Sequence, residues 1–129
     1  MRRVRLLLVA ATLVMAGTIG LATPAMASDK DHICEYREMC LYYYNNYIGH
    51  VMTFADVRHI PNLNSFFFAP GINVNDNSMS GKNRSDRRGA RLYVHSWLRG
   101  PNLHVGKGEN IPNFYPYNNQ FSSLWWQYV

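Results

Sequence analysis

Polar side chains that could bind a ligand are concentrated near the end of the chain, in the segment 115–126, which reads YPYNNQFSSLWW. Amide and hydroxyl side chains stand here between aromatic residues: Asn118, Asn119, Gln120, Ser122 and Ser123. Side-chain oxygens of this kind hydrogen-bond to a turning backbone and to the start of a strand. The segment is therefore predicted to be either a hydrogen-bonded turn or part of a ligand site.

A second set of residues has the types that a small ribonuclease would need: Glu35, Arg37, His95 and His104. Such an enzyme requires a histidine, a carboxylate and an arginine that converge on a phosphate. Nothing in the spacing of these residues predicts convergence. The sequence also has no H-E-x-x-H, G-x-S-x-G or phosphate-binding loop. We therefore expect a protein that is not an enzyme and requires no cofactor.

The chain has two cysteines, Cys34 and Cys40, separated by five residues. Zinc sites use other spacings, whereas a cysteine pair in an exported protein normally closes a disulfide. Closing so small a loop stabilises the fold by roughly 2–3 kcal/mol in the loop-entropy treatment. We expect a disulfide that fastens the N-terminal segment.

The first 27 residues have the pattern of a secretory signal peptide. Three arginines at positions 2, 3 and 5 precede an apolar run over residues 6–21, and Ala25-Met26-Ala27 follows as a cleavage site. The alternative, a membrane anchor, would need a longer uninterrupted run. We expect residues 1–27 to be removed and residues 28–129 to be extracellular, without membrane contact.

Composition narrows the partners of the expected mature chain. Removing the three signal arginines leaves 10 basic residues against 8 acidic ones, which gives a net charge near +2. This small net charge argues against a nucleic-acid partner, because nucleic-acid-binding domains are usually strongly basic. All 18 aromatic residues follow position 27, so aromatic burial is expected to supply much of the core of one domain.

The mature chain repeats itself at an offset of 51 residues. This offset aligns Leu41-Tyr42 with Leu92-Tyr93, Gly49 with Gly100, and residues 60–62 with residues 111–113, both IPN. We predict two copies, over about residues 34–83 and 90–127, inside one domain at 28–129. The charged segment at 84–89 is expected to be a solvated linker between them.

The pattern within each copy is that of short strands. Aromatic and β-branched residues concentrate at 41–44 and 51–54 in the first copy and at 91–95 and 103–105 in the second. No window has a sustained helical period. The predicted fold class is all-β, with two Greek-key motifs that form a β-sandwich.

Two segments resemble the βγ-crystallin motif, in which an aromatic residue is followed five positions later by another aromatic and then by x-Gly. The first copy has Tyr42, Tyr47 and Gly49 at these positions. The second copy has Tyr93 and Gly100, with Leu98 in place of the second aromatic. The glycine is expected to adopt a backbone angle that a side chain would penalise.

The polar cassettes also resemble a βγ-crystallin pattern, in which two Asn or Asp and two free positions precede two hydroxyl residues. Residues 118–123 match fully, whereas residues 75–80 (NDNSMS) have Met79 at the first hydroxyl position. Calcium binds six to eight oxygens, which a thioether does not supply. The resemblance implies at most one weak Ca²⁺ site, in which Ser122 completes the loop of the other copy. The candidate residues are Asn75, Asp76, Asn77, Asn118, Asn119 and Ser122; the alternative is that they only support turns.

The cysteine pair followed by Leu-Tyr, the signal and the two Greek keys together resemble secreted bacterial peptidase inhibitors of βγ-crystallin-like fold, typified by a metalloproteinase inhibitor. The resemblance covers residues 34–126 and implies a rigid loop offered to an extracellular protease, expected to be a metalloprotease. Those inhibitors carry a second disulfide, which this chain lacks. The candidate inhibitory loop is 64–71, with Phe66, Phe67 and Phe68; the alternative places these phenylalanines in the core or at the rim of the sandwich.

A secreted binding module or toxin-like protein is the other function that we considered. Trp97, Trp125 and Trp126 have the chemistry to stack on cell-wall polysaccharide. Because Trp125 and Trp126 are adjacent, they should point to opposite faces of a strand, which puts one of them in the core. The basic residues at 82–91 are expected to be solvated or to attract an anionic wall polymer.

Overall fold

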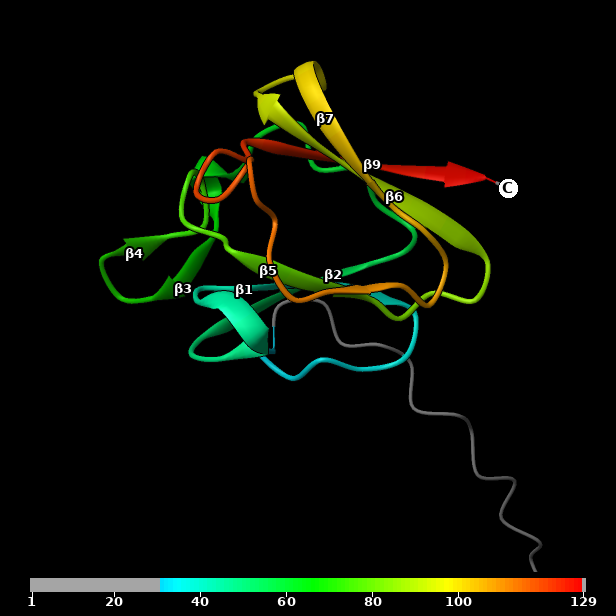
Figure 1. Cartoon of the computed structure of the whole chain (residues 1–129), viewed down its shortest axis with the longest axis horizontal. Coiled ribbons are helices and arrows are strands. Elements are labelled where there is room, and N and C mark those ends of the chain that lie inside the picture. Colours follow the sequence, from blue (N-terminus) through cyan, green and yellow to red (C-terminus); the bar gives the residue numbers. More distant parts are fainter. Residues whose placement is uncertain (1–30, 129) are drawn as a thin grey trace, which may run out of the picture.

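The computed structural model of the chain describes residues 31–128 (Figure 1). The expected signal peptide at 1–27 lies outside the described residues. The strands are β1 (Glu38–Tyr42), β2 (Val51–Ala55), β3 (Phe67–Ala69), β4 (Ile72–Asn73), β5 (Ser80–Asn83), β6 (Arg88–His95), β7 (Arg99–Val105), β8 (Asn110–Ile111) and β9 (Ser123–Tyr128). Two short 3₁₀ turns, η1 (Asn45–Tyr47) and η2 (Leu63–Ser65), connect them. Among the described residues, no helix has the length and apolar character needed to cross a membrane.

The strands form two packed sheets and a small hairpin. One sheet has the order β2-β1-β5-β8 and the other β7-β6-β9, while β3 pairs with β4. All pairings are antiparallel. Figure 1 shows the three-stranded sheet as one layer above the four-stranded sheet. This confirms the predicted sandwich, although β1 begins three residues earlier than the segment 41–44 indicated and ends at Tyr42.

Each copy has a short third extended segment, around Ile60 in the first copy and β8 in the second, and each of these segments pairs with a strand of the other copy. β8, from the second copy, pairs with β5 of the first copy, where Gly81 lies opposite Ile111. In return, Ile60 of the first copy bridges to Leu124 in β9 of the second. Ile60 and Ile111 are related by the repeat offset of 51 residues, so the exchange is reciprocal. Each sheet is therefore hydrogen-bonded to backbone of the other copy.

The repeated glycines occupy the hairpin between the first two strands of each copy. Gly49 has a φ of 84° and Gly100 a φ of 81°, which lie in the left-handed region as predicted. A Cβ on Gly49 would lie 2.8 Å from the Tyr44 ring. Beside it, the rings of Tyr42 and Tyr47 make an edge contact with centroids 5.7 Å apart. Local residue types therefore explain these corners.

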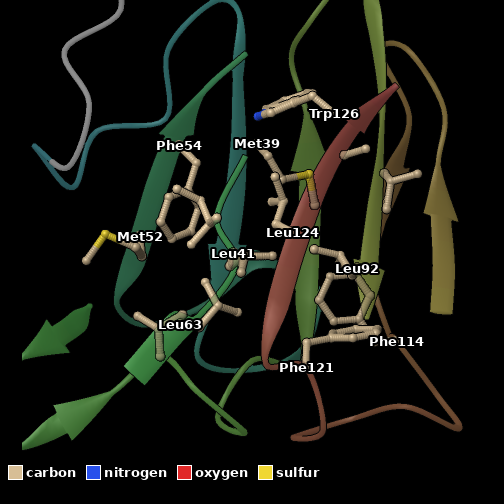
Figure 2. Packing of buried hydrophobic residues seen from close by; sticks show 14 of the residues in the cluster. Met39, Leu41, Met52, Phe54, Leu63, Leu92, Phe114, Phe121, Leu124 and Trp126 are labelled. Atoms are coloured by element: carbon tan, nitrogen blue, oxygen red, sulfur yellow. The ribbon is translucent and has the colours of Figure 1, made fainter. Parts of the chain in front are cut away.

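Aromatic and aliphatic side chains together fill the space between the sheets (Figure 2). Phe54, Phe114, Phe121 and Trp126 are completely buried there. Trp125 has an exposed fraction of 39%, whereas its neighbour Trp126 has 0%. The expectation that the two adjacent tryptophans point to opposite faces of one strand is thus confirmed.

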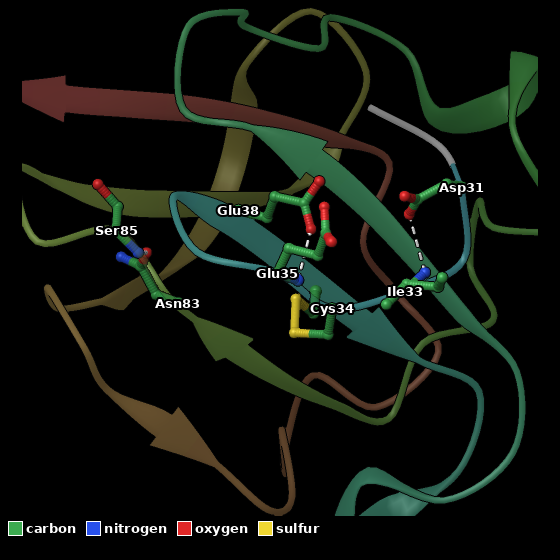
Figure 3. The surroundings of a disulfide bond; sticks show 8 residues. Asp31, Ile33, Cys34, Glu35, Glu38, Asn83 and Ser85 are labelled. Atoms are coloured by element: carbon green, nitrogen blue, oxygen red, sulfur yellow. Dashed lines mark hydrogen bonds between the residues drawn. A yellow bond between two sulfur atoms is a disulfide. The ribbon is translucent and has the colours of Figure 1, made fainter. Parts of the chain in front are cut away.

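The predicted disulfide is present, with the Cα atoms of Cys34 and Cys40 5.7 Å apart (Figure 3). The expectation of a solvated linker at 84–89 is wrong for Ser85, which is 1% exposed. Its hydroxyl donates a hydrogen bond of 2.7 Å to the buried carboxylate of Asp56. Asp56 also binds the guanidinium of Arg37, at 2.9 Å, next to the disulfide segment. The connection between the copies is therefore anchored through a buried charge.

Candidate functional site

The last serine of each polar cassette closes a hairpin. In the first copy, the hydroxyl of Ser80 donates to the carbonyl of Tyr44 at 2.6 Å and accepts from the N–H of Tyr47 at 3.0 Å. In the second, the hydroxyl of Ser123 donates to the carbonyl of His95 at 2.7 Å and accepts from the N–H of Leu98 at 3.1 Å. These two serines therefore have the turn-supporting role that was the alternative to ligand binding.

The second residue of each cassette has a left-handed backbone. Asp76 has a φ of 58° and Asn119 a φ of 57°, a conformation that Asn and Asp tolerate better than most residues. The N–H of Asp76 donates to the carbonyl of Phe121 at 3.0 Å, and the N–H of Asn119 donates to the carbonyl of Ser78 at 2.9 Å. The cassettes of the two copies therefore lie against each other and bond crosswise.

Ser122 meets Asp76 at this crossing. The hydroxyl of Ser122, in the second copy, lies 3.3 Å from Oδ1 of Asp76, in the first. Both residues line an open pocket of about 540 Å³, together with Val94, His95, Ser96, Asn119 and Gln120. Ser122 is 7% exposed, whereas Asp76 is exposed. The structure thus brings together one hydroxyl, one carboxylate and the hairpin of the second copy.

Three of the six candidate calcium residues do not line this pocket. Asn75 donates its amide to Oδ2 of Asp76 at 2.7 Å, and Asn77 donates to the carbonyl of Asn73 at 3.0 Å. Asn118 donates to Oδ1 of Asn113 at 2.8 Å. These side chains hold the loops and orient Asp76. Conversely, the sequence did not indicate that residues 94–96 line the pocket. The one available sign was their position in the predicted hairpin of the second copy.

The hydroxyl of Ser122 and the carboxylate of Asp76 offer two oxygens of the kind that calcium binds, out of the six to eight of a full site. Two oxygens 3.3 Å apart subtend roughly a right angle at a cation about 2.4 Å from both, which is an ordinary calcium geometry. In the first copy the equivalent of Ser122 is Met79, which offers sulfur. No group of three or more His, Cys, Asp or Glu that could hold a metal ion occurs among residues 31–128.

The candidate inhibitory loop forms the β3–β4 hairpin and the turn before it. Phe68 is 3% exposed, and its ring centroid lies 5.8 Å from that of Tyr43. Phe66 is half-buried, with its ring 5.1 Å from Phe54. Phe67, between them, has an exposed fraction of 48%. Two of the three phenylalanines thus join the core and its rim, as the alternative stated, and one points outward.

The residues considered for ribonuclease chemistry have separate surroundings. Arg37 binds Asp56 through Nε and Nη2. His104 lies in β7, against the backbone of Gly89, whereas the carbonyl of His95 supports a hairpin through Ser123. No phosphate-binding constellation results from these contacts.

Comparison with solved structures places the fold among βγ-crystallins. The N-terminal domain of Protein S aligns with a TM-score of 0.57 and 22% identity over 71% of this chain and 97% of that one. A βγ-crystallin from Ciona intestinalis aligns with a TM-score of 0.56 and 17% identity over 70% and 99% of the two chains. A βγ-crystallin domain from Flavobacterium johnsoniae aligns with a TM-score of 0.52 and 20% identity over 70% and 93%. These similarities show the fold.

Comparison of sequences identifies the family. No curated protein sequence gives a match. Residues 27–103, more than half of the chain, match peptidase inhibitor family I36. Membership of an inhibitor family makes a protease the partner and characterises the protein as non-enzymatic. With its two Greek keys and reciprocal third segments, the chain belongs to peptidase inhibitor family I36.

Proposed function

We propose that this protein is a secreted inhibitor that presents the β3–β4 hairpin to the cleft of an extracellular metalloprotease. The observation that carries the proposal is the exposure of Phe67, at 48%, between the anchored side chains of Phe66 and Phe68. An exposed aromatic residue on a fixed backbone suits a hydrophobic specificity pocket. The metalloprotease class follows the resemblance to the metalloproteinase inhibitors described above.

Rigidity of the hairpin supports this role. The amide of Asn73, opposite Phe67 in the pairing, donates to the carbonyl of Asn64 at 2.6 Å, and its Oδ1 accepts from the N–H of Asn75 at 2.7 Å. At the tip, Gly71 has a φ of 78° and follows a proline, as in a tight turn. A loop that is already ordered loses little entropy when it binds, which favours tight and slow-releasing complexes.

The test replaces Phe67 by aspartate and measures inhibition of a panel of secreted zinc and serine proteases. We expect the unmodified protein to inhibit a metalloprotease stoichiometrically and Phe67→Asp to weaken inhibition at least tenfold, because a charge cannot enter an apolar pocket without a large desolvation cost. Tyr115→Asp, at a residue with an exposed fraction of 80% outside this hairpin, is the matched control. Unchanged inhibition by Phe67→Asp would show that another surface contacts the protease.

A second proposal is that the pocket between Asp76 and Ser122 holds one Ca²⁺ ion. It is supported by the 3.3 Å approach of their oxygens across the two copies. A bound ion would join the cassette of the first copy to the cassette and hairpin of the second. Because an ion that binds only the folded state stabilises it, this site would strengthen the contact between the copies and leave the inhibitory hairpin free.

A further inference from the structure

The outer face of the three-stranded sheet carries a row of residues that the inhibitory role does not use. Trp125 in β9 lies opposite Arg91 in β6, and Arg91 lies opposite His104 in β7. Residues directly opposite on an antiparallel sheet point to the same face. The flanking residues Leu92, Leu124 and Trp126 are buried between the sheets, so the row lies on the outer face.

The indole of Trp125 is held in one orientation while a large part of it stays exposed. Its ring stacks on the imidazole of His59, with centroids 4.0 Å apart and planes at 15°. Nδ1 of His59 in turn accepts the backbone N–H of Trp126 at 3.0 Å. The side chain of Trp125 nevertheless keeps an exposed fraction of 39%. A fixed, exposed aromatic surface of this kind is suited to stacking on a flat ligand at low entropic cost.

The guanidinium of Arg91 lies next in the row and has donors to spare. Its Nη1 donates to Oδ1 of Asn102 at 2.7 Å, which is the one hydrogen bond of this side chain within residues 31–128. A guanidinium has five N–H donors in a fixed fork that matches a carboxylate. Asn102 therefore orients Arg91 and leaves most of its donors for a ligand.

His104 completes the row, and a glycine makes room for it. A Cβ on Gly89 would lie 2.6 Å from Nε2 of His104. The imidazole thus lies across the bare backbone of β6, where a larger residue would displace it. Arg91 lies between His104 and Trp125 in the row, so the donors of the two side chains follow the indole across the sheet.

The charge of this sheet has one sign. The strands β6, β7 and β9 contain three arginines and no aspartate or glutamate. The acidic residues next to the sheet lie outside its strands: Glu109 follows β7 and accepts the N–H of Gly106, Asp86 precedes β6, and the buried Asp56 pairs with Arg87. An exposed aromatic ring beside cationic and N–H donors, without acidic neighbours in the strands, is complementary to a ligand that is both flat and anionic.

We propose that this face binds an acidic polysaccharide, a chain of pyranose rings that carry carboxylates. The apolar face of one ring would stack on Trp125, while the carboxylate of the next would pair with Arg91 and reach His104. Neighbouring strands lie about 4.8 Å apart, a spacing close to the length of one sugar unit. The proposal does not depend on the inhibitory hairpin, because none of its residues belongs to β3 or β4.

The test measures binding of oligogalacturonate by tryptophan fluorescence and calorimetry, with EDTA present so that calcium cannot bridge protein and ligand. We expect saturable binding that weakens about tenfold or more in Arg91→Gln, the loss typical of one charged hydrogen bond, and similarly in Trp125→Ala, which removes the stacking surface. Trp97→Ala, at an exposed tryptophan in the β6–β7 turn, and Arg84→Gln, at an exposed arginine after β5, are the matched controls. Both should bind as the unmodified protein does.

Several outcomes would overturn the proposal. These are absence of binding, equal loss in Arg84→Gln, equal binding of neutral dextran, or equal binding of a single-stranded oligonucleotide. Should Trp125→Ala fail to fold, chemical-shift changes in the unmodified protein replace the variant. Oligogalacturonate should then shift the indole of Trp125 and the signals of Arg91 and His104, and shifts confined to other surfaces would refute the proposed site.

Discussion

Ser122 and Met79 stand at equivalent positions in the two cassettes, and this difference decides the number of calcium ions that we expect. Ser122 brings a hydroxyl to Asp76 at 3.3 Å, whereas Met79 brings a sulfur that a hard cation does not favour. Calorimetry should show one weak site, with a dissociation constant in the range of about 10⁻⁴–10⁻³ M that is typical of extracellular calcium modules; absence of any site would contradict the proposal.

Two substitutions test this assignment. Ser122→Ala should abolish calcium binding, and Met79→Ser should add a second site. Ser65→Ala, at an exposed serine of η2, removes a hydroxyl elsewhere and should change nothing. Two sites in the unmodified protein would contradict the assignment, because Met79 would then not have removed one.

His59 predicts a pH dependence of stability. Burial, and secondarily the charge of Arg88, lowers the pKa of His59 below its usual 6.5. Folding therefore favours the neutral ring, whose Nδ1 accepts the N–H of Trp126. The contribution of His59 to the free energy of unfolding is complete above about pH 6.5 and is lost as the pH falls toward the lower pKa of the folded state.

The variant His59→Asn tests this origin. An asparagine Oδ1 can accept the same N–H but does not titrate, so the variant should lose the decrease in stability between neutral and mildly acidic pH. Denaturant melts across this range measure the effect. His50→Asn, at an exposed histidine, is the control, and an unchanged pH profile in His59→Asn would assign the dependence to another group.

Asp56 joins two elements that the sequence separates. It is 1% exposed and binds Arg37 in the disulfide segment and Ser85 in the connection between the copies. Asp56→Asn removes the charge and leaves the arginine without its counter-ion, which should cost about 2–4 kcal/mol of unfolding free energy. Urea denaturation checks this value, with the exposed Asp86→Asn as control. A loss below about 0.5 kcal/mol, which is ordinary for surface changes, would show that the clamp is dispensable.

The elements differ in how far the sequence predicts them. The hairpin corners at Gly49 and Gly100 depend on local backbone angles, so residue types reveal them. The β3–β4 hairpin is hidden in the run FFFAPGIN, where three consecutive phenylalanines obscure the alternation of buried Phe68 and exposed Phe67. β8 and the Ile60 bridge are too short for a pattern and are defined by partners in the other copy.

At the scale of the whole molecule, the sequence repeat and its resemblance to βγ-crystallin motifs predicted the sandwich and one half of the candidate calcium site. They related Ser122 to the loop of Asp76, because both cassettes have recognisable spacing. They could not supply Val94, His95 and Ser96, which reach the pocket only through the packing of the copies. The buried position of Ser85 was equally hidden, since a charged segment is usually solvated and the tertiary partners of this serine, Asp56 and Gly108, are distant in the sequence.

The reciprocal third segments restrict how this chain can open. Separating the two copies requires breaking both the Ile60–Leu124 bridge and the Gly81–Ile111 pairing, so detachment of either copy breaks backbone hydrogen bonds at both sheets. Proteases cut chains mainly through local opening, at a rate set by the free energy of that opening. An interlocked pair of copies has few low-energy openings within the sheets. If the proposed inhibitory role holds, this interlock would help the protein to resist cleavage by the protease that it binds.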